Sequence, residues 1–179
     1  MNQSCTIEYE RTYLLKYVPN DLKNYPWEEI SDIYIPQNTE HPKLRMRKRG
    51  SKYEICKKYP IYEGDASQQH EFTIPITKEE FQELNENLQG KRARKHRYSY
   101  KYGGKLVEID VYLDGLKGLI LADVEFTSDQ EKANFSQPDF CLADVTQEKV
   151  VAGGMIVGKK YNDIEPILAK YGYKPLFLD

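Results

Sequence analysis

The stretch Leu44-Arg45-Met46-Arg47-Lys48-Arg49 places an arginine at every second position. A β-strand has a side-chain period of two, so these three arginines would share one face of a strand. Other short stretches also carry charges of a single sign at close spacing. They are Glu8-Tyr9-Glu10, Cys56-Lys57-Lys58, Lys95-His96-Arg97, Glu108-Ile109-Asp110 and Asp123-Val124-Glu125. The pattern predicts several strands, each with a charged face of one sign.

This segregation by sign is unusual for a β-protein. A β-sandwich normally buries apolar residues between its sheets and scatters charges of both signs outside. The alternative is that these faces are solvated and held by surface ion pairs of about 0–1 kcal/mol each. Cross-strand pairing would then favour mixed signs. Strands of one sign instead favour a cavity that binds a polyanion with its basic strands and metal ions with its acidic ones.

The alternation recurs along the chain and predicts about eight strands, mostly antiparallel. They are expected at residues 6–18, 32–35, 43–49, 52–59, 69–76, 92–100, 105–113 and 118–126. That number suits an eight-stranded antiparallel closed β-barrel, or tunnel, of the α+β class with a few flanking helices. Residues 19–31 are expected to be irregular or briefly helical, and residues 150–157 to be a late apolar strand or loop.

Three helices are expected beside the barrel. Thr77 and Glu80 form a capping-box signature before a helix that runs towards Gly90, and Ser128 is expected to cap a short helix. A last helix should begin at residue 162 and end near Gly172.

Length and composition narrow the function classes. With 179 residues the chain is expected to be one domain, residues 1–179. A net charge of −2 offers no bulk electrostatic case for a nucleic-acid or membrane partner. Three widely spaced cysteines and an N-terminus without signal-peptide features favour a cytoplasmic location.

The charged faces have complementary chemistry. Carboxylates gathered on one face repel one another unless cations compensate them, and Mg²⁺ or Mn²⁺ prefers such oxygen ligands. Guanidinium groups bind phosphate oxygens in pairs, and lysine adds point charge. The acidic set is Glu8, Glu10, Glu108, Asp110, Asp123 and Glu125, and the basic set is Arg45, Arg47, Arg49, Lys58, Lys95 and Arg97. Together they predict a site for a metal ion and a polyphosphate.

The ordered set of motifs resembles the CYTH superfamily, the triphosphate tunnel metalloenzymes. Glu8-Tyr9-Glu10 resembles the first part of its Glu-x-Glu-x-Lys signature, and Leu44-Arg45-Met46-Arg47 resembles its Arg-x-Arg strand. The remaining correspondences follow in family order as far as about residue 145: Cys56-Lys57-Lys58, Glu71-Phe72, Lys95-His96-Arg97, Glu108-Ile109-Asp110 and Asp123-Val124-Glu125.

The resemblance implies a role for each matched residue. It implies metal binding by Glu8, Glu10, Asp123 and Glu125, and phosphate binding by Arg45, Arg47, Lys58, Lys95 and Arg97. Glu71, Glu108 and Asp110 would support them. Tyr34 falls where triphosphatase-like members carry a tyrosine beside the signature lysine, and it would help to activate the attacking water.

The chain departs from the family pattern at three places. Thr12 replaces the signature lysine, Thr73 replaces a glutamate, and the late basic segment becomes the uncharged residues 150–154. Losing a general base typically costs about 10²–10⁴ in rate. Positioning and metal electrostatics supply most phosphoryl-transfer catalysis, so these changes weaken the case for turnover more than the case for binding.

The predicted activity is metal-dependent hydrolysis of a triphosphate, first of all inorganic triphosphate. The alternatives are a class IV-type adenylate cyclase and a catalytically impaired module that binds polyphosphate or a nucleotide. A lipocalin-like barrel would need an apolar interior, which the charged rows disfavour. The expected partner is a small triphosphate or nucleotide, with no nucleic acid or membrane, and the chain is expected to be a monomer or homodimer.

Overall fold

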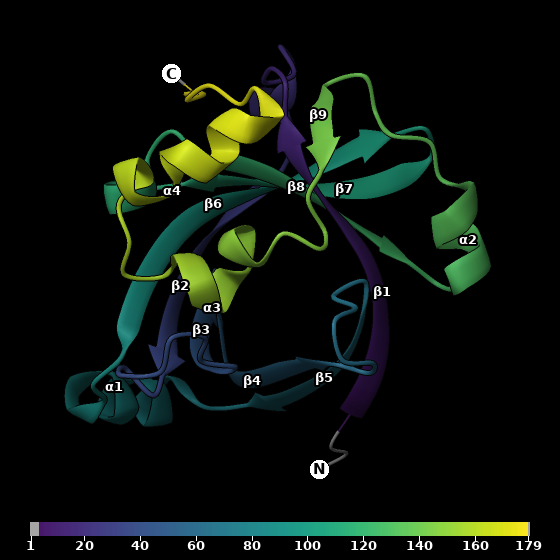
Figure 1. Cartoon of the computed structure of the whole chain (residues 1–179). Coiled ribbons are helices and arrows are strands. Elements are labelled where there is room, and N and C mark those ends of the chain that lie inside the picture. The colour runs from purple at the N-terminus through teal and green to yellow at the C-terminus, as the bar shows by residue number, and fades with distance from the viewer. Residues whose placement is uncertain (1–3, 179) are drawn as a thin grey trace.

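The structure is a computed structural model that describes residues 4–178, and its centre is a closed barrel of eight antiparallel strands (Figure 1). The strands are β1 (Ser4–Leu15), β2 (Trp27–Ile35), β3 (Leu44–Arg49), β4 (Lys52–Pro60), β5 (Gln68–Pro75), β6 (Lys91–Tyr102), β7 (Lys105–Tyr112), β8 (Ile120–Phe126) and the short β9 (Cys141–Asp144). Their order in the sheet is β5-β4-β3-β2-β6-β7-β8-β1-β9, and pairing of β5 with β1 closes the barrel.

β1 makes closure possible because it is long enough to serve three partners. Its first half pairs with β5 and its second half with β8. The last residues of β1 pair on the other edge with β9, which therefore lies outside the eight-stranded ring. The predicted eight-stranded antiparallel barrel is confirmed.

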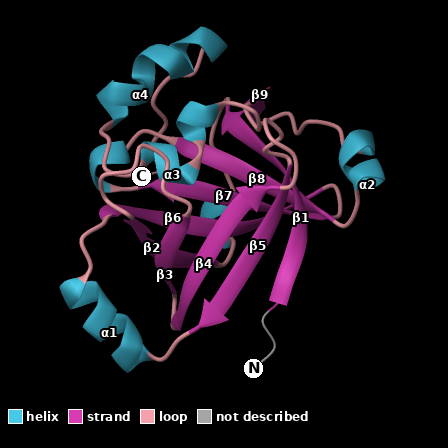
Figure 2. Cartoon of the chain, turned by 60° about the horizontal axis from the view of Figure 1, so that its bottom comes forward, coloured by secondary structure: helices cyan, strands magenta, loops and turns pink. Residues whose placement is uncertain are grey.

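Short helices connect and flank the strands (Figure 2). The α-helices are α1 (Lys78–Asn87), α2 (Asp129–Asn134), α3 (Gly153–Ile156) and α4 (Tyr161–Leu168). The 3₁₀ turns are η1 (Leu22–Asn24), η2 (Asp114–Leu116), η3 (Lys149–Val151) and η4 (Ala169–Tyr171). No helix within residues 4–178 is long and apolar enough to cross a membrane.

Local sequence explains the predicted helices. The Thr77 hydroxyl accepts from the Glu80 amide and Glu80 accepts from the Thr77 amide, which completes the capping box of α1. Ser128 caps α2 through the Glu131 amide. The turn η4 continues α4 and is capped by Gly172, whose φ of 76° is the left-handed conformation that favours glycine.

The outer face of the barrel carries the apolar residues of the alternating pattern. α1 covers part of it by packing Phe81 against Ile33 of β2 and Met46 of β3. Phe140 and Cys141 belong to a larger outer cluster with residues of β1, β7 and β8. With the apolar side chains packed outside the strands, the alternate charged side chains are left to face inward.

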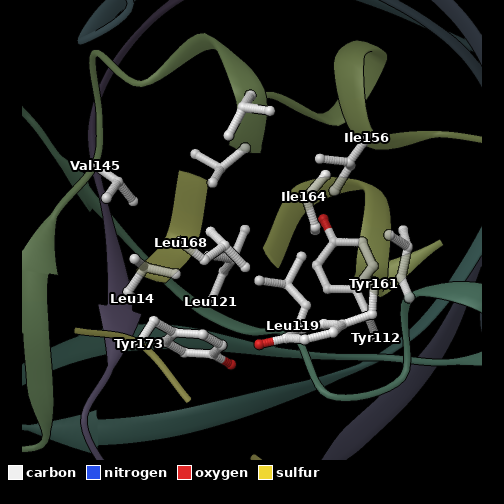
Figure 3. Packing of buried hydrophobic residues seen from close by; sticks show 13 residues of the cluster. Leu14, Tyr112, Leu119, Leu121, Val145, Ile156, Tyr161, Ile164, Leu168 and Tyr173 are labelled. Carbon is white, nitrogen blue, oxygen red and sulfur yellow. The ribbon is translucent and has the colours of Figure 1, made fainter. Parts of the chain in front are cut away.

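A third apolar cluster joins residues of β1, β7 and β8 to the C-terminal helices (Figure 3). Leu14, Leu121 and Tyr112 belong to the same alternating faces as the acidic residues of β1, β8 and β7. They pack against Ile156 of α3 and Ile164 of α4. The inward face thus changes from charged to apolar along these strands, and the C-terminal segment packs against the apolar part.

Three local expectations were wrong or incomplete. Residues 150–157 form η3 and α3 instead of a strand or loop. β2 begins at Trp27, inside the segment expected to be irregular, because it pairs with β6 over its whole first half. β9 was not predicted, since a four-residue strand leaves little periodic signal and depends on the free edge of β1.

Candidate functional site

The barrel encloses a cavity of about 570 Å³ lined by charged side chains from all eight strands. Every predicted site residue except Asp110 lines it: Glu8, Glu10, Tyr34, Arg45, Arg47, Lys58, Glu71, Lys95, Arg97, Glu108, Asp123 and Glu125. Glu125 keeps contact with solvent, whereas Arg47, Lys95 and Arg97 are buried. The interior is therefore polar, which excludes the lipocalin-like alternative.

The acidic strands are neighbours and form one wall of the cavity. In the sheet β7 lies beside β8 and β8 beside β1. The register sets Glu10 directly opposite Glu125, and Glu108 directly opposite Asp123. Like charges in directly opposed positions destabilise a sheet, so this wall is complementary to cations.

The protonation behaviour of the wall agrees with this crowding. Burial, and then the nearby Asp110 carboxylate, raises the pKa of Asp123 to about 6. Burial, followed by Glu108, also raises the pKa of Glu125. Both shifts mean that the ionised carboxylates lack sufficient positive charge around them.

The wall is the candidate site for the divalent metal that the resemblance implies. No group of three or more His, Cys, Asp or Glu side chains within residues 4–178 is arranged to hold a metal ion. The chemistry of the donors nevertheless fits a hard cation, because directly opposed carboxylates supply the oxygen ligands that Mg²⁺ and Mn²⁺ prefer.

Lys58 lies among three carboxylates. Its Nζ is 3.0 Å from Glu10 Oε2 and 3.5 Å from Glu71 Oε2, and it also forms an ion pair with Glu8. Burial lowers the pKa of Lys58, but the neighbouring Glu10 and Glu8 outweigh burial and raise it. Burial raises the pKa of Glu8 to about 7 despite Lys58. One lysine thus holds carboxylates from β1 and β5 together.

Asp110 lies beneath the cavity surface, where it holds two basic residues. Arg97 donates to it from Nε at 2.7 Å and from Nη2 at 2.6 Å, and Lys95 forms an ion pair with it. Burial opposes ionisation of Asp110, but Arg97 and then Lys95 lower its pKa below the usual value. Asp110 therefore contacts the two basic side chains without itself lining the cavity.

Asp32 plays the equivalent part for Arg47 and was missed by the sequence reasoning. Arg47 donates to both Asp32 carboxylate oxygens, at 2.7 Å from Nε and 2.8 Å from Nη2. Burial opposes ionisation, but Arg47 lowers the pKa of Asp32 to about 2. Asp32 stands two residues before Tyr34 in a predicted strand, so the period of two could have identified it.

Tyr34 is buried at the cavity wall with its hydroxyl beside the basic rows. The hydroxyl accepts a hydrogen bond of 3.1 Å from Arg45 Nη1, its neighbour across the β2–β3 pair. α3 packs over the same hydroxyl, because a Cβ on Gly153 would collide with it. The ring is thereby held from two sides.

Both threonines that depart from the family pattern lie in the cavity. Thr12 Oγ1 donates to Asp123 Oδ1 at 2.8 Å, and Thr73 Oγ1 donates to Glu71 Oε1 at 3.0 Å. Each therefore hydrogen-bonds to a carboxylate without adding a charge.

Cys56 is the only cysteine of the basic strand β4, where it stands beside Lys57 and Lys58. The side chain is buried, and burial raises the pKa of its thiol to about 11. A thiol in that state is not nucleophilic near neutral pH.

Comparison with known proteins identifies the family. No protein-family model matches the chain. It is 33% identical to the inorganic triphosphatase of Nitrosomonas europaea over 144 residues, which cover 79% of this chain and 91% of that protein. A crystal structure of an inorganic triphosphatase superposes with a TM-score of 0.61 at 26% identity, covering 87% of this chain and 97% of the other.

A more distant solved structure shares the fold. A putative adenylate cyclase from Bacillus halodurans superposes with a TM-score of 0.53 at 13% identity, covering 98% of this chain and 95% of the other. The close relative, the ordered motifs and the closed charged barrel agree with one another. The chain belongs to the CYTH superfamily, the triphosphate tunnel metalloenzymes.

Proposed function

We propose that this protein hydrolyses inorganic triphosphate to pyrophosphate and phosphate inside the barrel, with Mg²⁺ or Mn²⁺. The observation that carries the proposal is that surfaces of opposite charge line one cavity. An acidic wall on β7, β8 and β1 lies in the same enclosure as the basic rows of β3, β4 and β6. The identity to an inorganic triphosphatase selects the substrate.

The basic rows neutralise and align the phosphates. The guanidinium groups of Arg45, Arg47 and Arg97 suit pairs of phosphate oxygens, while Lys58 and Lys95 add point charge. Asp32 and Asp110 fix Arg47 and Arg97 in place before substrate arrives. This preorganisation reduces the reorganisation that would otherwise accompany phosphoryl transfer.

The acidic wall is the proposed metal site, held by Glu8, Glu10, Asp123 and Glu125. A metal ion bound there would offset the negative charge of the phosphate oxygens. Tyr34 is proposed to orient the attacking water, with its hydroxyl fixed by Arg45. The water oxygen bonds to the terminal phosphorus as the bridging P–O bond breaks, pyrophosphate leaves with the bridging oxygen, and the attacking water loses a proton to solvent.

Two other functions have specific support. Class IV-type adenylate cyclase activity is the enzymatic alternative, favoured by the shared fold of a putative adenylate cyclase. A binding module with little turnover is the other, favoured by the neutral Thr12 and Thr73 in the cavity. In each case one domain spanning residues 1–179 acts in the cytoplasm as a monomer or homodimer.

A phosphate-release assay separates these functions. Purified protein is incubated with triphosphate, pyrophosphate, ATP and thiamine triphosphate, each with Mg²⁺, Mn²⁺ or EDTA. Metal-dependent release that is fastest from triphosphate supports the proposal. Formation of cyclic AMP from ATP would favour the cyclase, and calorimetric binding without release would favour the binding module.

A further inference from the structure

Most basic side chains in the cavity already have carboxylate partners. Arg47 pairs with Asp32, Arg49 with Glu28, and Lys95 with Asp110. Arg45, Lys58 and Arg97 are paired in the same way. Their charge is therefore largely balanced within the protein.

One group of basic residues differs, and it is called here the basic rim: His41, Lys43 and Lys149. All three line the cavity. Lys43 Nζ lies 3.0 Å from His41 Nε2. Within residues 4–178, none of the three has a carboxylate oxygen within 4.0 Å, in contrast to the paired rows.

The positive charges of the rim repel one another, which makes the protonated forms of its groups less favourable. Burial lowers the pKa of Lys43, and the charge of Lys149 lowers it further. Burial and then Lys43 lower the pKa of His41. Glu40 raises the pKa of His41, but its effect is the smallest of those acting on this group. The Glu148 carboxylate accepts a hydrogen bond of 3.0 Å from the Tyr171 hydroxyl.

Tertiary packing fixes the rim beside Tyr34. Gly153 lies against the Tyr34 hydroxyl, and a Cβ on the next residue, Gly154, would collide with the Pro42 carbonyl and lie 2.7 Å from His41 Cδ2. Two consecutive glycines thus allow α3 to lie against both sites. Lys149 stands in η3, directly before α3. The rim is therefore adjacent to the proposed site of water attack.

We propose that the basic rim is an additional anion subsite, which binds one phosphate group of a linear polyphosphate. This inference rests on the proposed function. It adds a substrate contact outside the basic residues that are paired with carboxylates. Two ammonium groups and an imidazole without carboxylate partners are complementary to a phosphate dianion. Within the rim, Lys149 also supplies a positive charge directly before residues 150–154, which have none.

The test is calorimetric binding of inorganic triphosphate to the full chain in EDTA, where no metal-dependent turnover competes. The double variant Lys43→Met/Lys149→Met should raise the Kd at least tenfold. The matched control is Lys48→Met/Lys57→Met, which removes the same charge from exposed residues outside the cavity. It should raise the Kd less than twofold, and Lys43→Arg/Lys149→Arg should bind like wild type.

Equal Kd values for the two methionine variants would overturn the subsite. Thermal melting of both establishes that they are folded. The outcome is separable from that of the proposed function. Wild-type protein that binds triphosphate through the rim but releases no phosphate with metal refutes the hydrolase and keeps the subsite. Wild-type turnover of triphosphate together with an unchanged Kd in the rim variant keeps the hydrolase and refutes the subsite.

Discussion

Thr12 Oγ1 donates a 2.8 Å hydrogen bond to Asp123 Oδ1, its direct partner in the β1–β8 register. The residue that replaces the signature lysine therefore points into the cavity at the acidic wall. A lysine at this position would bring an amine to the carboxylate whose pKa is raised to about 6. The geometry makes Thr12 a direct test of whether a missing amine limits turnover.

We expect Thr12→Lys to raise kcat for triphosphate at least tenfold, within the range of about 10²–10⁴ typical of a general base. Steady-state phosphate release with Mg²⁺ or Mn²⁺ measures it. The control Thr12→Val removes the hydrogen bond to Asp123 without adding an amine, and it should give no gain. An unchanged or lower rate in Thr12→Lys would show that the missing lysine is not the limitation.

Tyr34→Phe should lower kcat about 100-fold and change KM little. The substitution keeps the ring against α3 but removes the hydroxyl that Arg45 fixes, and a positioned acid–base group typically contributes about 10²–10⁴ in rate. Kinetic assays of both parameters check this. The control is Tyr53→Phe, since Tyr53 packs on the outer side against Phe81. Equal kcat values for the two variants would remove Tyr34 from the mechanism.

Arg97→Met should destabilise the fold by about 3–5 kcal/mol, because it leaves the buried Asp110 carboxylate without its main partner. Urea unfolding gives the free energy. Adding Asp110→Asn should restore part of the loss. Arg94 lies in the same strand as Arg97, and Arg94→Met, which breaks the exposed pair with Asp114 of η2, should have a much smaller effect. Similar losses in the two single variants would refute the importance of burial.

The Asp32–Arg47 pair should make stability depend on pH in acid. The pKa of Asp32 falls from 3.8 to about 2 on folding, so its contribution is complete above pH 4 and is lost as the pH falls towards 2. The shift corresponds to about 2 kcal/mol. The comparison is with Asp32→Asn/Arg47→Met, which lacks both charges.

The unfolding free energy of wild type minus that of the double variant should therefore shrink by about 2 kcal/mol between pH 5 and pH 2. Chemical denaturation across this range measures the difference. A difference that stays constant would mean that Asp32 titrates normally in the folded protein.

Much of the fold was predictable because its signal is local. A period of two in residues such as Arg45 and Arg47 specifies a strand and a charged face at once, whatever the partner strand. The capping box at Thr77 and the left-handed Gly172 are equally local. By contrast, β9 and the start of β2 depend on partners far along the chain, so the sequence pattern did not contain them.

The sequence by itself determined which side chains share a strand face and which sign each face carries, because alternation follows from backbone geometry. Only the tertiary structure decided which charges meet. Barrel closure places Lys58 among Glu8, Glu10 and Glu71, and the β1–β8 pairing opposes Glu10 to Glu125. Packing of the C-terminal segment brings Lys149 to His41 and Lys43, more than a hundred residues away. Coulomb energy depends on distance in space, and sequence spacing fixes that distance only within one element.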